Sequence, residues 1–270
     1  LMREAIEKSK VKKIDLVSYS SSPGLPPCLK IGLEAAKDIA KDLNADIIGV
    51  NHCISHLSSA HFFTKVKNPI YVFVSGANTQ IISLEEKRFR LLGETLDVGL
   101  GNALDKLGRG LVLGFPAGPK IEELAKKGSY IELPYTVKGM DLSFSGIITS
   151  ALNKFKQGEN KENICYSVQE TLFSILIEVT ERALAFTGKK EAVIIGGVAA
   201  NKRLGEMLSI MCKERGASFY AVPIKYAGDN AVNIGLQGLL EYKYGRRQKL
   251  EKSDINPYER VDDIKVFWEY

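Results

Sequence analysis

All three histidines of the chain, His52, His56 and His61, fall within one ten-residue stretch. His52 and His56 are four residues apart, so on a helix they would share one face and could bind one metal ion. They follow the apolar run 47–50, a predicted strand, and open α/β sheets place ligands at the carboxyl ends of their strands. A histidine pair at this spacing also occurs by chance on exposed helices, but the clustering favours a metal site. A zinc protease needs a glutamate between the two histidines, and none is present here.

Two glycine-containing turns are the second feature that could indicate a ligand-binding site. Ser75, Gly76 and Ala77 interrupt two apolar runs, and Gly196 and Gly197 follow the apolar run 192–195 and open a predicted helix. Glycine allows a ligand to approach the backbone closely, and helix N-termini favour anions. Each turn could equally be an ordinary tight connection. Neither matches a dinucleotide-binding or a P-loop fingerprint.

Three acidic residues stand near these turns. Asp105 follows Gly99-Leu100-Gly101, Glu122 lies four residues after Gly118, and Asp229 follows a predicted strand. Each could be a helix cap or a solvated charge. Asp229 could also complete a His/His/Asp site, since imidazole and carboxylate together suit zinc or iron. Sequence alone does not bring it close to His52.

Apolar runs alternate with segments of helical periodicity along the chain. The predicted strands are 14–19, 47–50, 70–74, 79–83, 89–92, 192–195 and 219–222. The predicted helices are 29–43, 103–110, 119–127, 168–185, 202–214 and 230–244. Residues 70–92 read as an antiparallel meander, and residues 192–222 read as a βαβ unit. This combination predicts a mixed sheet flanked by helices.

The composition is that of an ordinary globular protein. The 270 residues are 45% hydrophobic and 26% charged, with a formal net charge of +5. The four cysteines lack CxxC spacing and read as reduced cytosolic thiols. No apolar run approaches the roughly 20 residues of a membrane-spanning helix. Two basic clusters, Lys10-Lys12-Lys13 and Arg246-Arg247-Lys249, permit a polyanionic partner without requiring one.

Taken together in chain order, these residues resemble one known family. The motifs are Asn51-His52 with His56, Ser75-Gly76-Ala77-Asn78-Thr79-Gln80, Gly93-Glu94-Thr95-Leu96-Asp97, Asp105-Lys106, Pro116-Ala117-Gly118-Pro119, Phe144-Ser145-Gly146, Gly196-Gly197-Val198-Ala199-Ala200-Asn201 and Asp229-Asn230. Their order and spacing are similar to those of the TsaD/KEOPS catalytic-subunit family of tRNA N6-threonylcarbamoyladenosine transferases, in its archaeal and eukaryotic branch. The family was formerly described as an O-sialoglycoprotein endopeptidase. The resemblance covers essentially the whole chain.

The resemblance implies an actin-like ATPase (ASKHA) fold with two ribonuclease-H-like lobes. We expect residues 1–70, joined by 245–270, to form the rest of the first lobe. Residues 71–244 would form the second lobe, with the nucleotide and metal site in the cleft. The family's leading β-hairpin and histidine-containing helix have no counterpart here, and the first residue is Leu1. We therefore expect a truncated first lobe that exposes a sheet edge.

The resemblance also implies ligands. His52, His56 and Asp229 match the family's metal ligands, and the metal would be iron or zinc. The positions that match its adenine-nucleotide site (ATP, AMP or threonylcarbamoyl-AMP) are Phe73, Val74, Ser75, Gly76, Ala77, Asp105, Gly118, Glu122 and Asn201. No catalytic side chain is assigned, and Cys53 is the only candidate for a covalent intermediate.

The implied reaction is transfer of threonylcarbamoyl from its adenylate to N6 of adenosine 37 in tRNAs that read ANN codons. The implied setting is a cytoplasmic KEOPS complex with a small kinase-like ATPase, a dimerising subunit and a tRNA-binding helper. Phe73 stands where the archaeal family commonly has a tyrosine metal ligand. This departure and the missing front keep one alternative open, an impaired scaffold subunit of the same complex. A kinase of the same fold is a second alternative.

Overall fold

The computed structural model describes residues 2–270, with side chains from residue 4 onward, so Leu1 lies outside the described residues. Close packing divides the chain into two units, which we call the first and second lobes. The first lobe contains the residues up to Ser58 together with Asn230–Glu269. The second contains Ser59–Asp229 and Tyr270. The chain therefore leaves the first lobe after Ser58 and returns to it at Asn230, and only Tyr270 at its end belongs again to the second lobe.

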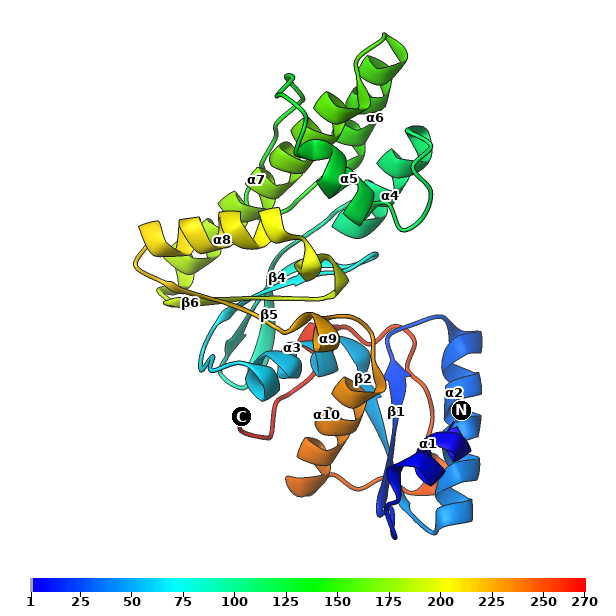
Figure 1. Cartoon of the computed structure of the whole chain (residues 1–270). Helices are drawn as coiled ribbons and strands as arrows, with labels where there is room; N and C mark the ends of the chain where they lie inside the picture. Colours follow the sequence, from blue (N-terminus) through cyan, green and yellow to red (C-terminus); the bar gives the residue numbers. More distant parts are fainter. Residues whose placement is uncertain (1) are drawn as a thin grey trace. The chain divides into compact units, whose positions relative to one another are not determined.

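A two-stranded parallel sheet forms the centre of the first lobe (Figure 1). Its strands are β1 (Leu16–Ser22) and β2 (Asp46–Asn51), and they are joined by α2 (Pro26–Leu43). Tyr19 and Ile47 of the sheet pack with Leu33, Ala36 and Ala40 of α2 in one buried cluster. Burial of this apolar stripe drives α2 onto the sheet. The lobe also contains α1 (Met2–Ser9), α10 (Ala231–Lys243) and the short helices η2 (Leu250–Lys252) and η3 (Val261–Asp263).

The lobe boundaries differ from those expected. We expected 230–244 in the second lobe, but α10 packs against β1 and β2 of the first. The contact is close: a Cβ on Gly238 would lie 2.1 Å from Ser18 Oγ. At the other boundary, the end of α3 (His52–Phe63) belongs to the second lobe, where Phe63 stacks on Tyr226 with ring centroids 3.9 Å apart. The two compact units divide at 58/59 and 229/230, whereas the sequence analysis placed the boundaries at 70/71 and 244/245.

A five-stranded mixed sheet forms the centre of the second lobe, in the order β5-β4-β3-β6-β7. Its strands are β3 (Ile70–Val74), β4 (Thr79–Glu85), β5 (Arg88–Glu94), β6 (Glu191–Ile195) and β7 (Ser218–Ala221). The meander β3–β4–β5 is antiparallel, and β6 pairs in parallel with both β3 and β7. Both the predicted meander and the predicted βαβ unit are confirmed. Every residue of β3 is buried, as expected for a central strand that is covered on both faces.

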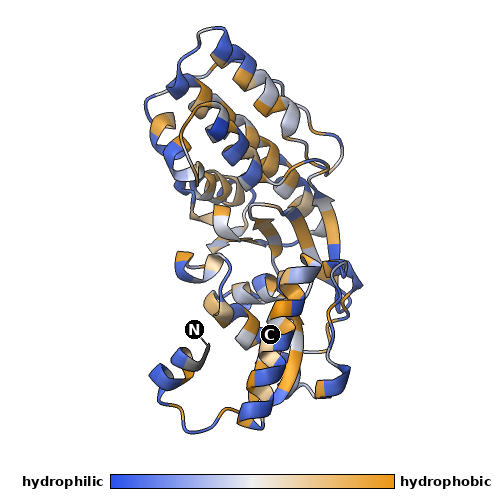
Figure 2. Ribbon diagram, turned by 90° about the vertical axis from the view of Figure 1, so that its right-hand side faces the viewer, coloured by the Kyte–Doolittle hydropathy of each residue, from blue (hydrophilic) through white to orange (hydrophobic). Residues whose placement is uncertain are grey.

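Helices cover this sheet. They are α4 (Leu100–Gly110), α5 (Gly118–Ala125), α6 (Ser145–Lys156), α7 (Lys161–Thr187), α8 (Lys202–Glu214) and the short η1 (Gly197–Ala200) and α9 (Ile224–Ala227). Figure 1 shows α7 and α8 lying along one side of the sheet. The core there joins β3 and β6 to α4, α7 and α8 through residues such as Val72, Leu104 and Leu172. In Figure 2 the strands of this sheet are largely orange, while loops and helix ends carry much of the blue.

The sequence analysis did not predict α6. Its first turns contain Ile147, Ile148 and Thr149, and β-branched residues lower intrinsic helix propensity. Burial of Ile147, Ile148 and Ala151 in the core, and packing on α4 and α7, outweigh that preference. None of the described helices is long and apolar enough to cross a membrane.

Candidate nucleotide and metal sites

The sheet of the second lobe brings two glycine turns to one edge. β3 and β6 are adjacent and parallel, so their carboxyl ends lie side by side. The Ser75–Asn78 turn leaves β3, and the Gly196–Asn201 segment leaves β6. Parallel strands whose ends carry such turns form the usual ligand edge of an α/β sheet.

A cavity of about 240 Å³ opens at this edge. Its lining residues are Gly76, Gly101, Leu104, Asp105, Pro116, Gly118, Pro119, Glu122, Gly197, Val198, Ala200 and Asn201. Five of the nine predicted nucleotide-site residues are among them: Gly76, Asp105, Gly118, Glu122 and Asn201. They come from four separate segments of the chain, which the fold brings together.

The other four predicted residues do not line the cavity. Phe73 and Val74 are fully buried in β3. Ser75 shapes the turn instead, since its N–H donates to Asn78 O at 2.8 Å and its Oγ accepts from Asn78 N at 3.0 Å. Ala77 packs against Gly99, where an added Cβ would lie 2.3 Å from Ala77 O. These residues therefore support the wall rather than form its surface.

Backbone approaches keep the turn in place. A Cβ on Gly101 would lie 2.8 Å from Ser75 O, and the Gly101 N–H donates to that same oxygen at 3.1 Å. Gly196 has φ +93°, and a Cβ there would lie 2.2 Å from Val74 O. Both positions require glycine to let two segments meet. Gly197 and Gly118 differ, because a Cβ on either would meet nothing within 4 Å.

Two carboxylates are held at the cavity wall by backbone donors. Asp105 Oδ1 accepts from Ala117 N at 2.8 Å, and Glu122 Oε1 accepts from Lys202 N at 2.9 Å. Asn201 caps α8 by accepting from Leu204 N at 3.0 Å. These bonds fix each side chain's orientation and leave the second carboxylate oxygens able to accept from a ligand hydroxyl.

Asp97 holds the loop before α6 in place through hydrogen bonds to its carboxylate. The sequence analysis did not assign this role. The Asp97 carboxylate accepts from Ser143 Oγ at 2.7 Å and from the N–H groups of Phe144 and Ser145. Burial acts to raise the pKa of Asp97, but these hydrogen bonds outweigh it and hold the pKa well below its usual value. Asp97, in the Gly93–Asp97 motif, thus fixes the position of the first residues of α6.

The predicted metal ligands have suitable chemistry and spacing. α3 begins at His52 and carries both histidines, and their ring centroids are 4.7 Å apart. Asp229 directly precedes Asn230, which caps α10 by accepting from Asn233 N at 3.1 Å. One ligand atom each from His52, His56 and Asp229 lie within 4.8 Å of one another. Two imidazoles and a carboxylate form a donor set that zinc or iron accepts.

His61 lies apart from this set. Its Nε2 lies 2.6 Å from the Tyr71 hydroxyl, and its ring stacks on Tyr270 with centroids 3.9 Å apart. Burial lowers the pKa of His61 to about 4 and raises the pKa of Tyr71 well above its ordinary value. The imidazole is therefore neutral near pH 7, and one hydrogen bond joins its Nε2 to the tyrosine hydroxyl. The third histidine of the cluster has a packing role.

A family model of tRNA N6-adenosine threonylcarbamoyltransferase, TsaD, matches residues 1–236. The chain belongs to the TsaD family. It is 49% identical over 270 residues to the tRNA N6-adenosine threonylcarbamoyltransferase of Archaeoglobus fulgidus, covering all of this chain and 84% of that protein. It is 50% identical over 272 residues to the Thermococcus sibiricus protein of the same name, covering 99% of this chain and 84% of that one.

Longer relatives also match this TsaD-family chain. One is a probable bifunctional tRNA threonylcarbamoyladenosine biosynthesis protein of Methanosarcina barkeri, 51% identical over 270 residues that make up 49% of its length. Among solved structures, HypF of T. kodakarensis superposes with a TM-score of 0.66 at 18% identity, covering 88% of this chain and 42% of that one. That similarity concerns the fold alone and confirms the actin-like ASKHA assignment.

Proposed function

We propose that this chain transfers threonylcarbamoyl from threonylcarbamoyl-adenylate to N6 of adenosine 37 in tRNAs that read ANN codons. Family membership supports the transferase activity. The observation that carries the finer proposal is the cavity of the second lobe, whose walls suit the three parts of an adenylate. The proposal includes a cytoplasmic setting and partner subunits of the KEOPS type.

Each part of the adenylate has a matching wall. Leu104, Pro116 and Val198 offer apolar surface for the adenine ring. Asp105 and Glu122 suit the ribose hydroxyls, because a carboxylate accepts from a hydroxyl and repels a phosphate. The phosphate would therefore lie toward Gly76 and Gly197, where the backbone can be approached closely.

The reaction is an acyl transfer from a mixed anhydride. The adenine N6 forms a bond to the carbamoyl carbon, the bond from that carbon to the phosphate oxygen breaks, and AMP leaves while the amine loses a proton. Bound at His52, His56 and Asp229, an iron or zinc ion would orient the threonylcarbamoyl group and polarise its oxygens. The chain's own contribution is to hold the adenylate still, and such positioning supplies much of an acyl transfer's acceleration.

The experiment combines metal analysis with nucleotide titration on one preparation. We expect bound iron or zinc in the wild type and its loss in His52→Ala and His56→Ala. AMP binding should survive both changes, because the cavity lies wholly in the second lobe. His61→Gln is the matched control on the same helix. This variant should still bind both the metal ion and AMP. A histidine variant that retains the metal, or a wild type that does not bind AMP, would overturn the proposal.

A further inference from the structure

The side chain of Asn51 caps the first turn of α3. Asn51 immediately precedes α3, and its Oδ1 accepts from Ile54 N at 3.1 Å, the geometry of an N-cap. His52 and His56 both lie in the first two turns that follow. The direction of the two imidazoles therefore depends on how firmly this cap is made.

An asparagine amide can present either its oxygen or its nitrogen to the helix. Only the oxygen can cap, since the helix N-terminus offers donors. Asn51 is only 4% exposed, so water does not compensate for the wrong orientation. A neighbouring residue must fix the amide.

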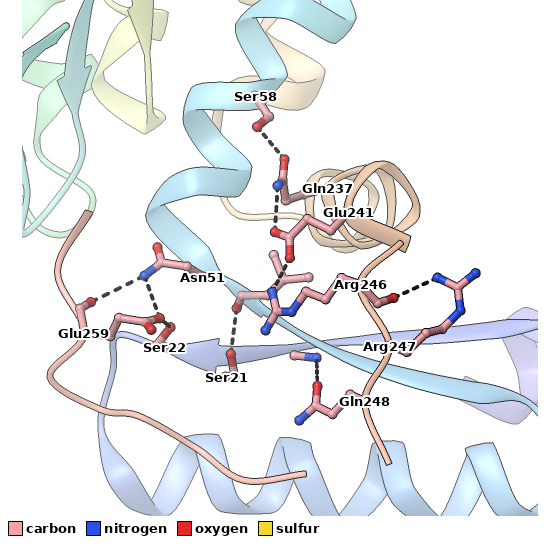
Figure 3. A network of polar contacts seen from close by, with 12 residues as sticks. Ser21, Ser22, Asn51, Ser58, Gln237, Glu241, Arg246, Arg247, Gln248 and Glu259 are labelled. Atoms are coloured by element: carbon pink, nitrogen blue, oxygen red, sulfur yellow. Dashed lines mark hydrogen bonds and ion pairs between the residues drawn. The ribbon is translucent and has the colours of Figure 1, made fainter. Parts of the chain in front are cut away.

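Glu259 supplies that constraint from the C-terminal segment. The Asn51 amide nitrogen donates to Glu259 Oε2 at 3.2 Å and to the Glu259 carbonyl oxygen at 3.4 Å. The hydroxyl of Ser22, which is fully buried, donates to the same Oε2 (Figure 3). Because Glu259 presents only acceptors, the amide nitrogen must face it and Oδ1 must face the helix.

The segment that carries Glu259 is tied to β1. Asn256 N donates to Ser21 O at 2.9 Å, and Gly24 N donates to Pro257 O at 3.2 Å. Glu259 N donates back to Asn256 O at 3.2 Å. These backbone hydrogen bonds fix the position from which the Glu259 side chain reaches Asn51.

A separate set of contacts holds α3 further along. Ser58 Oγ donates to Gln237 Oε1, and Gln237 Nε2 donates to Glu241 Oε1 at 2.7 Å (Figure 3). Glu241 in turn pairs with Arg246. This second set does not include Glu259, so the effect of Glu259 should be confined to the first turn of the helix.

We propose that Glu259 is a positioning residue for the His52–His56 pair, acting by fixing the orientation of the Asn51 amide that caps α3. The part of this inference that concerns a bound metal rests on the proposed metal site. The part that concerns the cap does not. Outer partners of metal ligands typically change metal affinity by about 10- to 100-fold when they are replaced.

The test uses two readouts on the full chain. Hydrogen exchange of the Ile54 amide in metal-free protein reports the cap, and titration with Co²⁺ reports the histidine pair. Glu259→Met keeps the side-chain length and the backbone carbonyl but removes the side-chain acceptor, which receives the shorter of the two hydrogen bonds from Asn51. We expect it to speed Ile54 exchange about 10-fold and to weaken Co²⁺ binding by a similar factor, while the amide of Ser58 is unchanged. Glu259→Gln should behave like wild type, because its amide oxygen still accepts. Glu251→Met, an exposed glutamate of the same segment, is the matched control.

A second substitution separates orientation from general packing. Asn51→Asp has two acceptor oxygens, so it has no wrong orientation, but it places a carboxylate against Glu259. It should therefore weaken the cap in the wild-type background and restore Ile54 protection in the Glu259→Met background. Failure of that reversal, or unchanged Ile54 exchange in Glu259→Met, would overturn the role of Glu259. A wild type that binds no Co²⁺ while the exchange pattern holds would instead overturn the metal site and the proposed link to it. Should Glu259→Met fail to fold, Asn51→Asp in the wild-type background still decides the question, because unchanged Ile54 exchange there would overturn the role of Glu259.

Discussion

At the scale of single residues, surroundings decide which histidine can do chemistry. His52 and His56 stand in the first turns of a helix beside a carboxylate, whereas His61 is stacked against Tyr270 and bonded to Tyr71. The sequence spacing predicted the shared face of the first pair. It could not exclude His61, since the contacts that bury that ring come from residues far along the chain.

His61 should make the protein less stable in mild acid. Burial lowers the pKa of His61 in the folded protein to about 4 from its ordinary value of 6.5. As the pH falls through this window the unfolded chain binds the proton first, so stability is complete above pH 6.5 and is lost progressively toward pH 4. The loss should reach on the order of 3 kcal/mol. Denaturant unfolding between these pH values should show that the free energy of unfolding declines less steeply with falling pH for His61→Gln than for wild type. Parallel declines would contradict the lowered pKa of His61.

The cysteines should divide by exposure. Cys28 is exposed, whereas Cys53, Cys165 and Cys212 are buried, and all four are free thiols. Burial raises the pKa of Cys165 to about 12 and that of Cys212 to about 11. A thiol reagent at pH 8 should therefore label Cys28 rapidly in native protein and the others only after unfolding. Cys28→Ser should abolish the fast phase, and a remaining fast phase would show that a buried thiol is accessible.

At the scale of elements, the strand ends build the candidate nucleotide cavity, and the two adjacent glycines after β6 differ in their surroundings. Gly196 is needed by the fold, because its φ is +93° and Val74 O lies where its Cβ would be. Gly197 has open space around it and lines the cavity. The first glycine closes the turn and the second leaves room for the ligand.

This difference predicts opposite outcomes for two neighbouring substitutions. Gly197→Val should fold with a melting temperature close to that of wild type but lose AMP binding by at least about 100-fold, since its branches would occupy the path to the backbone. Gly196→Val should lower the melting temperature sharply. Calorimetric titration and thermal unfolding of both proteins would test this. Undiminished AMP affinity in Gly197→Val would show that the ligand does not approach that turn.

Hydrophobic periodicity predicted the helices that bury a clear apolar face and the strands formed by apolar runs. It missed the elements whose conformation is set by tertiary packing. All seven predicted strands occur, because apolar runs such as that of β3 are fully buried. α6 was missed because its β-branched start is helical only in contact with α4 and α7. Likewise α7 begins at Lys161, seven residues before the predicted start, because Asn160 caps it by accepting from Asn163 N at 2.7 Å.

Of the candidate sites, the glycine turns and acids could be singled out by residue type, and the family resemblance linked them to a nucleotide. Gly76, Asp105 and Asn201 illustrate this, since each lines the cavity. The apolar wall could not be predicted, because Leu104, Pro116 and Val198 look like any core residue in the sequence. The role of Glu259 could not be predicted either, because Glu259 lies 208 residues after Asn51 in the sequence and the two meet only in the folded chain.

At the scale of the whole molecule, two cations of the basic clusters are paired with acidic side chains. Arg247 lies over the ring of Tyr242, 3.6 Å from its centroid. Lys13 pairs with Asp15 at 2.5 Å, and Arg246 pairs with Glu241. Paired cations release fewer counterions from a nucleic acid than free ones do.

We therefore expect weak tRNA binding by this chain alone and much tighter binding once partner subunits join. Its affinity for tRNA should fall only gently with salt when it is alone and more steeply in the assembly. A salt titration of tRNA binding with and without partners would measure both slopes. Tight binding by the isolated chain near physiological salt would show that its own surface suffices.

The most direct test of the proposed function is the modification itself. Purified chain, supplied with threonylcarbamoyl-adenylate, unmodified tRNA and the partner subunits, should form N6-threonylcarbamoyladenosine, detected by mass spectrometry of the tRNA nucleosides. Gly197→Val and His56→Ala should each reduce the yield by at least about 100-fold, and Glu251→Met should match wild type. A preparation that binds both AMP and metal yet leaves adenosine 37 unmodified, under conditions where a family relative modifies it, would contradict the account.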